Sequence, residues 1–282
     1  MFSSCARSTI SRVFAVVCSP ARVSSSWARA TSGSKSPQLC RHLGLDVTVI
    51  EMTERAMSRV VAPPLSAFYA EQHAAHGVQL HFNTTVSAFA GDGAVREVVL
   101  HRRSAFPGGY CGGRNWHPAG DRHCGRRRHC LRQRYRRETS TAAPVRSDVY
   151  AAGDCTNHPS PRYGRRVRLE SVDHAFEHAR SAAANMLGKA VVHDKVPWFW
   201  SDQYDLKLLI VGLSHGYDEC VVRGDPATRS FSVCYLRGGE LIAVDAVNSA
   251  KDYMAARKLI AERARLNVAR IADATIQLKD AH

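Results

Sequence analysis

The sequence predicts an α/β protein in which part of an α/β domain precedes a small α+β domain. Two observations support this class. Residues 44–100 follow the order strand, helix, strand, hairpin, and residues 196–264 contain alternating apolar runs followed by a helix. Residues 101–145, between these regions, show no periodicity. The chain of 282 residues is long enough for one large domain or two modest ones.

The first region begins with a short apolar strand, Val47, Val49 and Ile50, that ends at Glu51. The helical stretch after it carries its larger side chains at i, i+3, i+4 and i+8 spacing, at Leu65, Phe68, Tyr69 and His73. A further strand and a hairpin are predicted at Gln79–Phe82, Val86–Phe89 and Ala94–Leu100. This order is half of a Rossmann-like dinucleotide-binding domain.

Order resumes with Val149–Asp154, which predicts a strand running into a turn. A helix is predicted over Glu170–Leu187, with one stripe formed by Val172, Phe176, Ala179, Ala183 and Met186. Alternating runs past Pro197 predict the strands of a small antiparallel α+β domain, at Leu206–Leu213, Glu219–Arg223, Phe231–Leu236 and Leu241–Val247. A helix near Ala250–Ala264 and a polar tail follow these strands.

Two segments carry the excess positive charge of the chain, which is +14 overall. Residues 1–43 contain six cationic side chains and no acid, and residues 101–138 contain eleven arginines against Asp121 and Glu138. The other residues are close to neutral, as in an ordinary globular protein. A nucleic-acid-binding protein would spread its basic side chains over a folded face, so this distribution argues against nucleic acid as a partner.

The composition also bears on the compartment in which the chain works. Residues 1–43 are rich in Ser and Arg and free of acids, as mitochondrial transit peptides are. The chain has nine cysteines without a repeating spacing and no secretory signal, which predicts reduced thiols and a cytoplasmic protein. No run of about 18 apolar residues exists, so no membrane span is predicted.

Three stretches carry a family resemblance. They are Gly44–Glu51 (GLDVTVIE), Val149–Cys155 (VYAAGDC) and Val196–Gln203 (VPWFWSDQ). The second continues into Asn157-His158-Pro159, Arg162-Tyr163-Gly164 and Glu170-Ser171-Val172. Together they resemble the ferredoxin/rubredoxin reductase branch of the FAD-dependent pyridine-nucleotide oxidoreductases. The resemblance covers about residues 44–100 and 146–275.

The resemblance implies a flavin site in the second and third stretches. Asp154 is expected to meet the ribityl chain of FAD, and Gly153 to allow close backbone approach. The helix that begins at Glu170, Ser171 and Val172 is expected beneath the flavin pyrimidine ring, where its free N–H groups and positive dipole end suit the reduced ring system. Trp200 is expected to lie against the flavin.

The first stretch implies the nucleotide site. An acid at the end of the second Rossmann strand accepts hydrogen bonds from ribose hydroxyls and repels a 2′-phosphate, so Glu51 favours NADH over NADPH. Arg55 is a second candidate for NADH binding. The implied activity is electron transfer from NADH through FAD to a [2Fe–2S] ferredoxin that serves an oxygenase or a P450, with a homodimer as one state of the chain.

The sequence contains no G-x-G-x-x-G fingerprint, although the family uses one for FAD and one for NADH. Residues 28–37 can be back-translated so that a frame one base upstream encodes Gly-Ala-Gly-Tyr-Ile-Gly-Leu-Glu-Val-Ala. Residues 110–121, back-translated and read one base downstream, permit a buried strand with a Gly turn. Residues 130–137, read in the same way, permit a hairpin. The interpretation is that both basic segments are frame-shifted products of a GC-rich gene, and that cofactor binding is impaired.

This interpretation divides the chain into five parts. They are a Ser/Arg-rich segment, a remnant of the NAD-binding domain, a poorly ordered Arg/His/Cys-rich segment, the end of the FAD-binding domain and the reductase C-terminal domain. Their boundaries are 1–43, 44–100, 101–145, 146–195 and 196–282.

Two alternatives remain beside this function, and a third, a disulfide reductase, is set aside. A zinc-dependent nucleic-acid-binding protein could use Cys111, His117, His123, Cys124, His129 and Cys130, although their spacing fits no regular finger. A non-catalytic remnant could keep only a C-terminal domain that docks a partner or dimerises. A disulfide reductase would need a redox cysteine pair near the flavin, whereas Cys155 is single.

Overall fold

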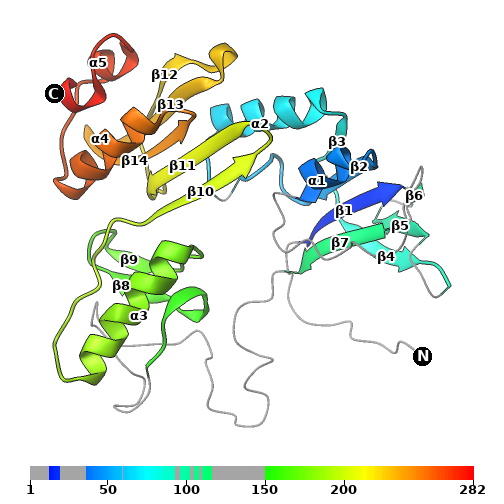
Figure 1. Ribbon diagram of the computed structural model, residues 1–282, viewed down its shortest axis with the longest axis horizontal. Helices are drawn as coiled ribbons and strands as arrows, with labels where there is room; N and C mark the ends of the chain where they lie inside the picture. The colour runs from blue at the N-terminus through cyan, green and yellow to red at the C-terminus, as the bar shows by residue number, and fades with distance from the viewer. Residues whose placement is uncertain are drawn as a thin grey trace. The chain divides into compact units, whose positions relative to one another are not determined.

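The structure, a computed structural model, describes residues 13–19, 36–58, 60–92, 96–101, 105–107, 110–115 and 150–282 (Figure 1). These residues belong to two compact units. The first is drawn from Met1–Ser58 and Ser66–Pro118, and the second from Arg59–Leu65 and Ala119–His282. None of the described helices combines the length and apolar character needed to cross a bilayer.

The centre of the first unit is a parallel strand pair joined by a helix. Strand β2 (Asp46–Glu51) pairs in parallel with β3 (Val78–His81), and α2 (Pro63–Ala75) connects them. Val47, Val49 and Val78 are buried together, because alternate side chains of a strand face the same side. The predicted strand, helix, strand order of a Rossmann half is therefore confirmed.

The strands around this pair were predicted only in part. The hairpin of β4 (Val86–Ala90) and β5 (Glu97–Leu100) is antiparallel, as predicted. Residues without periodicity form β6 (Ala105–Pro107) and β7 (Tyr110–Asn115), and the Ser/Arg-rich segment contributes β1 (Val13–Ser19) and α1 (Ser36–His42). Strand β1 lies antiparallel between β2 and β7, giving a four-stranded sheet in the order β3-β2-β1-β7. Strands are defined by backbone hydrogen bonds, which can form without an alternation of apolar and polar side chains. The sequence pattern therefore did not predict β1, β6 and β7.

The second unit begins with turns rather than the predicted strand. Residues 150–152 have no regular structure and Gly153–Cys155 form a single 3-10 turn, η1. The prediction of a strand over Val149–Asp154 is therefore wrong for its described part. Ala152 is extended, but no described strand pairs with this segment, and an extended backbone without a partner is not a strand. A short hairpin follows, β8 (His158–Ser160) with β9 (Arg165–Val167).

Helix α3 (Val172–Met186) lies within the predicted bounds but presents the opposite face. The residues of the predicted apolar stripe are all exposed: Val172, Phe176, Ala179, Ala183 and Met186. The buried residues of the helix are His174, His178 and Ala182. The apolar stripe therefore does not pack into the core of this unit.

The C-terminal domain has the predicted antiparallel α+β architecture. Its five strands are β10 (Trp198–Gln203), β11 (Leu206–Gly212), β12 (Glu219–Asp225), β13 (Ser230–Arg237) and β14 (Glu240–Val247), in the order β10-β11-β14-β13-β12. Helix α4 (Ala250–Ala261) packs on β14 and β11 (Figure 1). The core between them is apolar and includes Val211, Leu236, Leu241, Val244 and Ala256.

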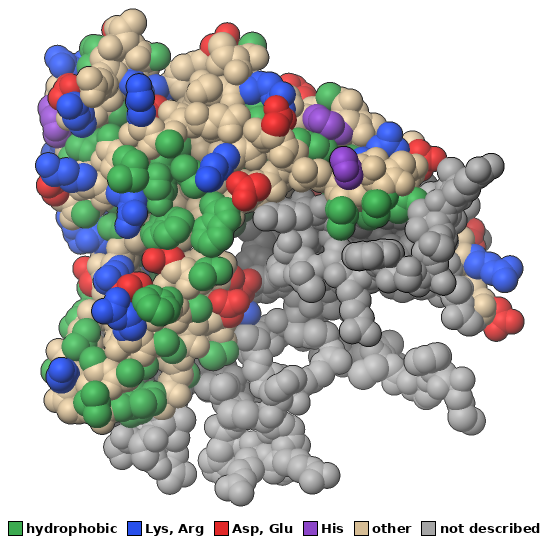
Figure 2. Space-filling model, in the orientation of Figure 1, with side chains coloured by type: hydrophobic (Ala, Val, Ile, Leu, Met, Phe, Trp, Pro, Cys, Tyr) green, Lys and Arg blue, Asp and Glu red, His purple; other side chains and the backbone are tan. Residues whose placement is uncertain are grey.

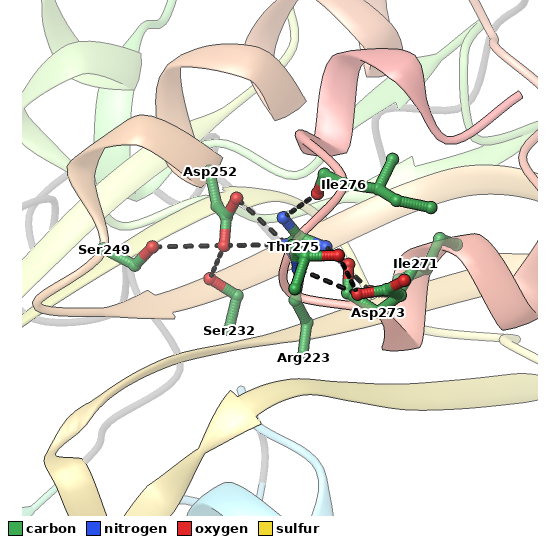
Figure 3. Close-up of polar contacts among 8 residues, drawn as sticks. All are labelled: Arg223, Ser232, Ser249, Asp252, Ile271, Asp273, Thr275 and Ile276. Carbon is green, nitrogen blue, oxygen red and sulfur yellow. Dashed lines mark hydrogen bonds and ion pairs between the residues drawn. The ribbon is translucent and has the colours of Figure 1, made fainter.

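The polar tail predicted after this helix is folded onto the domain. It contains α5 (Val268–Ala272) and η3 (Leu278–Asp280), and Ile271 and Leu278 are buried. The buried guanidinium of Arg223 on β12 pairs with Asp252 at 3.2 Å and donates to the carbonyls of Ile271, Asp273 and Ile276 (Figure 3). One side chain therefore joins β12, α4 and the tail.

Candidate functional site

The turn that carries the predicted flavin residues requires a glycine. Gly153 is buried and has a φ of +78°, a left-handed conformation that glycine adopts without a steric penalty. A Cβ added there would meet Cα and Cβ of Ala175 at 3.5 Å, so the turn lies directly against the first turn of α3. Thr156 fastens the turn by donating to the Gly153 carbonyl at 2.7 Å. Asp154 is exposed beside it, where a ligand could reach its carboxylate.

The start of α3 has the character of an anion-binding helix end. Ser171 is the N-cap, and its hydroxyl accepts from the His174 N–H at 3.1 Å. Val172, the first residue of the helix, is 68% exposed. Because the first backbone N–H groups of a helix have no intrahelical partner, this end can receive negative charge. The Glu170 carboxylate, which precedes this cap, forms an ion pair with the Arg168 guanidinium at 2.9 Å.

Trp200 lies on the first strand of the C-terminal domain. Its ring is stacked on that of Trp198, with centroids 5.6 Å apart and an interplanar angle of 28°. Trp200 remains 40% exposed. Strand β10 also contacts α3. The structure thus brings the strand of Trp200 to the helix whose start holds Ser171 and Val172.

The predicted nucleotide residues belong to the first unit. Glu51 is the last residue of β2, at the carboxyl end of a parallel pair, where ligands of open α/β sheets bind. Its Oε1 accepts from the backbone N–H and the hydroxyl of Thr53, at 2.8 and 2.9 Å. Arg55 donates to the Ser58 carbonyl at 3.1 Å. Both side chains take part in the loop after β2.

The cysteines and histidines between Cys111 and Cys130, which the zinc-dependent alternative would use, lie outside the described residues, apart from the backbone of Cys111 in β7. The same is true of most of the segments interpreted as frame-shifted. The cysteines whose side chains the structure describes are Cys40, Cys155, Cys220 and Cys234, and all four are free thiols. Among these residues there is accordingly no redox disulfide beside the Gly153 turn.

A buried histidine cluster was not predicted from the sequence. It consists of His158, His174, His178 and His193, whose ring centroids are separated by 4.6 to 5.5 Å. The Gly153 N–H donates to Nδ1 of His178 at 3.4 Å, which joins the cluster to the candidate flavin turn. The i, i+4 spacing of His174 and His178 on one predicted helix was the available signal.

The residues present fit the flavin end of FAD better than its phosphates. A left-handed glycine turn, a helix start with free N–H groups and a half-exposed tryptophan are suited to a flat ring system with a polar edge. The sequence has no G-x-G-x-x-G turn to hold a pyrophosphate.

Comparison with known proteins identifies the family. Residues 35–179 match the model for pyridine nucleotide-disulphide oxidoreductases, and residues 198–282 match the model described as reductase C-terminal. The chain is 38% identical to the 5,5'-dehydrodivanillate O-demethylase ferredoxin reductase subunit of Sphingobium sp. (strain NBRC 103272 / SYK-6), over 88% of this chain and 61% of that protein. It is 34% identical to putidaredoxin reductase CamA of Pseudomonas putida, over 84% of this chain and 56% of that protein.

Solved structures give the same result. The ferredoxin reductase for the CYP199A2 system from Rhodopseudomonas palustris has a TM-score of 0.72 and 31% identity, over 88% of this chain and 61% of that one. The covalent putidaredoxin reductase–putidaredoxin complex has a TM-score of 0.66 and 33% identity, over 82% and 56%. The chain spans about three fifths of the length of these relatives. Because one family model covers more than half of its residues, this chain belongs to the pyridine nucleotide-disulphide oxidoreductases, in the ferredoxin reductase branch that carries the reductase C-terminal domain.

Proposed function

We propose that the chain derives from an FAD-dependent NADH:ferredoxin oxidoreductase and retains the flavin end of its site. The observation that carries this proposal is the packing of the Gly153 turn against α3, with the Gly153 Cβ position 3.5 Å from Ala175. FAD, when bound, would supply the chemistry of accepting a hydride from NADH and releasing single electrons. A [2Fe–2S] ferredoxin of an oxygenase or P450 system would be the acceptor.

Each candidate residue has a physical role in this proposal. Asp154 would accept hydrogen bonds from the ribityl hydroxyls, and Trp200 would stack on the ring system. The N-terminus of α3, capped by Ser171, would stabilise negative charge on the pyrimidine edge. Glu51 would accept from the ribose hydroxyls of NADH, which requires its carboxylate to turn from Thr53 or to use its second oxygen.

An absorbance spectrum of the purified chain is the first test. Bands near roughly 370 and 450 nm, at about one flavin per chain, would indicate bound oxidised FAD. Asp154→Ala should then weaken FAD binding, while Asp218→Ala on the C-terminal domain should leave it unchanged. Reduction of a [2Fe–2S] ferredoxin by NADH, and much less by NADPH, would support the acceptor and the role of Glu51. A flavin-loaded protein that prefers NADPH would contradict that role.

The second candidate function is a non-catalytic remnant. It is favoured by the absence of any G-x-G-x-x-G turn, together with a C-terminal domain that has its own continuous core. This candidate predicts a folded, colourless protein that takes up no FAD on titration. Binding of a ferredoxin, or self-association, by the colourless protein would separate docking from catalysis.

The origin of the two basic segments is tested on the gene. We propose that residues 1–43 and 101–145 include frame-shifted sequence, and that the chain works in the cytoplasm. Resequencing of the coding DNA should reveal a base change before and after each segment. DNA that confirms the present frame, with an active flavoprotein as product, would refute the frame shifts. Import of residues 1–43 with a reporter into mitochondria would refute the cytoplasmic location.

A further inference from the structure

Four imidazole rings converge in the second unit, from three separate segments. His158 comes from β8, His174 and His178 from α3, and His193 from the connection to β10. Their exposed fractions are 6%, 2%, 1% and 6%. Each ring lies within 5.5 Å of the other three, measured between centroids. Four buried rings of one ligating type at this distance need a physical explanation.

Several nitrogens of these rings have no hydrogen-bond partner among the residues that the structure describes. They are Nδ1 of His158, both ring nitrogens of His174 and Nε2 of His178. A buried polar atom without a partner costs about 1–3 kcal/mol, so the arrangement is unfavourable unless something satisfies it. Burial, followed by the charges of neighbouring histidines, lowers the pKa of His158, His174 and His178 to about 3. Neutral imidazole nitrogens of this kind are the commonest metal ligands in proteins.

We propose that this cluster is a transition-metal site, for Zn²⁺ or a similar divalent ion, with His158, His174 and His193 as ligands. One ligating nitrogen from each of the three lies within 4.8 Å of the others. Tetrahedral Zn–N bonds of about 2.0–2.1 Å place ligand nitrogens roughly 3.4 Å apart, so binding would draw the rings together by rotation of their side chains. Imidazole suits Zn, Cu, Ni and Fe, whereas Ca and Mg prefer oxygen ligands.

Contacts behind the rings support this assignment. The Ser181 hydroxyl lies 3.3 Å from Nδ1 of His193, which orients that ring with its Nε2 directed away from Ser181. His178 is the nearest candidate for the fourth position, through its buried Nε2. Its Nδ1 lies 3.4 Å from both the Gly153 nitrogen and the Thr156 hydroxyl. Metal binding through Nε2 would require the ring proton to move to Nδ1, where the Thr156 oxygen would accept it in place of the contact with the Gly153 N–H.

The charges around the cluster are mixed. The carboxylates of Glu177, Asp173 and Asp194 act on His193, and Lys195 opposes them. Arg166 acts on His158 and donates to the Asn157 carbonyl. Three acids against two bases can offset part of the charge of a divalent ion bound to neutral imidazoles. A bound ion would join β8, α3 and the connection to β10, and would hold α3 in place behind the Gly153 turn.

The test uses the full chain, expressed without a histidine tag. Metal analysis of the protein as purified should find about one transition-metal ion per chain. After removal of the metal with a chelator, Co²⁺ should produce the intense visible absorption of a tetrahedral site, and Zn²⁺ should bleach it at one equivalent. Zn²⁺ should also raise the melting temperature of the stripped protein. None of these measurements depends on FAD, so the outcome is separate from that of the proposed oxidoreductase.

His174→Phe is the decisive variant, because phenylalanine keeps a buried ring and removes both unpartnered nitrogens. It should lower the affinity for Co²⁺ and Zn²⁺ by about a hundredfold or more while the protein stays folded by circular dichroism. His193→Gln is the second variant if His174→Phe does not fold. The exposed His215→Phe is the matched control and should bind as wild type does. Absence of a cobalt band in the wild type, or an unchanged affinity in both cluster variants, would overturn the proposal.

Discussion

The C-terminal domain (residues 196–282) and the α3 region (residues 150–195) bury opposite kinds of side chain. The five-stranded sheet and α4 enclose aliphatic residues such as Leu241 and Val244. Helix α3 buries His174 and His178, and hydrophobic side chains lie exposed over its part of the surface, at lower left in Figure 2. Burial of apolar surface stabilises a fold without further conditions, whereas burial of polar groups does so only when their hydrogen bonds or ligands are supplied. The stability of the C-terminal domain therefore depends on apolar burial, and that of the α3 region depends on partners for its buried histidine nitrogens.

The two regions also respond to pH in opposite directions. Burial raises the pKa of Asp245 in the sheet to about 7, so its contribution to stability is present below the unfolded pKa near 4 and is lost as the pH rises through 7. Burial lowers the pKa of His174 and His178 to about 3, so their contribution is present above the unfolded pKa of 6.5 and is lost as the pH falls. Acid should open the α3 region while the sheet remains folded.

The largest expected effect is at Arg223, the polar centre of the apolar domain (Figure 3). Arg223→Met leaves the partly buried Asp252 without its cation and frees the tail carbonyls, which should cost about 3–5 kcal/mol of unfolding free energy. Urea unfolding followed by tryptophan fluorescence measures this loss. The control is Lys258→Met, because the exposed pair of Lys258 and Glu262 is 3.9 Å long and worth under about 1 kcal/mol. Equal losses in both variants would show that Arg223 is not the anchor of the tail.

The second effect concerns Asp245, whose carboxylate accepts from the Tyr235 hydroxyl at 2.5 Å. The Ala62 N–H donates to the same hydroxyl at 3.1 Å. The wild type should lose up to about 4 kcal/mol between pH 4 and pH 7 through this group. Asp245→Asn should remove that slope, while the exposed Glu219→Gln should retain it. Unfolding free energies across this pH range decide the question. A slope that survives in Asp245→Asn would place the titrating group elsewhere.

The C-terminal domain was predictable because its pattern and its packing agree. In β12, Val221 and Arg223 are buried while the residues between and beside them are more exposed, so the alternation there reports burial, whereas Phe231–Leu236 is buried along its whole length. The tail was not predictable, since Arg223 holds it through backbone carbonyls that any sequence would provide. Of the candidate site, the sequence predicts the local backbone, namely the turn at Gly153 and the position of Glu51 at the end of its strand, while the ligand roles of these residues stay predictions.

Helix α3 shows why the sequence predicted the wrong buried face for this helix. Its limits follow from the Ser171 cap, but periodicity assumes that the apolar side faces inward. Histidine counts as polar in such a pattern, so a face of His174, Ala182 and His178 was taken for the solvent side. The strand expected before Gly153 failed for another reason, because strand formation needs a neighbour that sequence alone does not specify.

The third effect is at His174 in the metal-stripped protein. His174→Phe should stabilise α3 by about 1–3 kcal/mol at pH 7, because two desolvated nitrogens without partners are removed. It should also make α3 less sensitive to acid below pH 6.5, since one depressed pKa is removed. Hydrogen exchange of peptides within Val172–Met186 measures local opening. His215→Phe should exchange as wild type does. Faster exchange in His174→Phe would mean that the imidazole has a partner in solution.

The smallest effect is expected on the exposed stripe of α3. Phe176 is 62% exposed, with the Arg180 guanidinium 5.7 Å from its ring centre. Phe176→Ser should therefore change the unfolding free energy by less than about 0.5 kcal/mol. Phe231→Ser, at a site only 2% exposed, should cost about 3–5 kcal/mol. A loss above about 1 kcal/mol in Phe176→Ser would show that the stripe is covered in solution. Concentration-dependent sedimentation would then distinguish a second copy of the chain, which shifts with dilution, from a bound flavin, which does not.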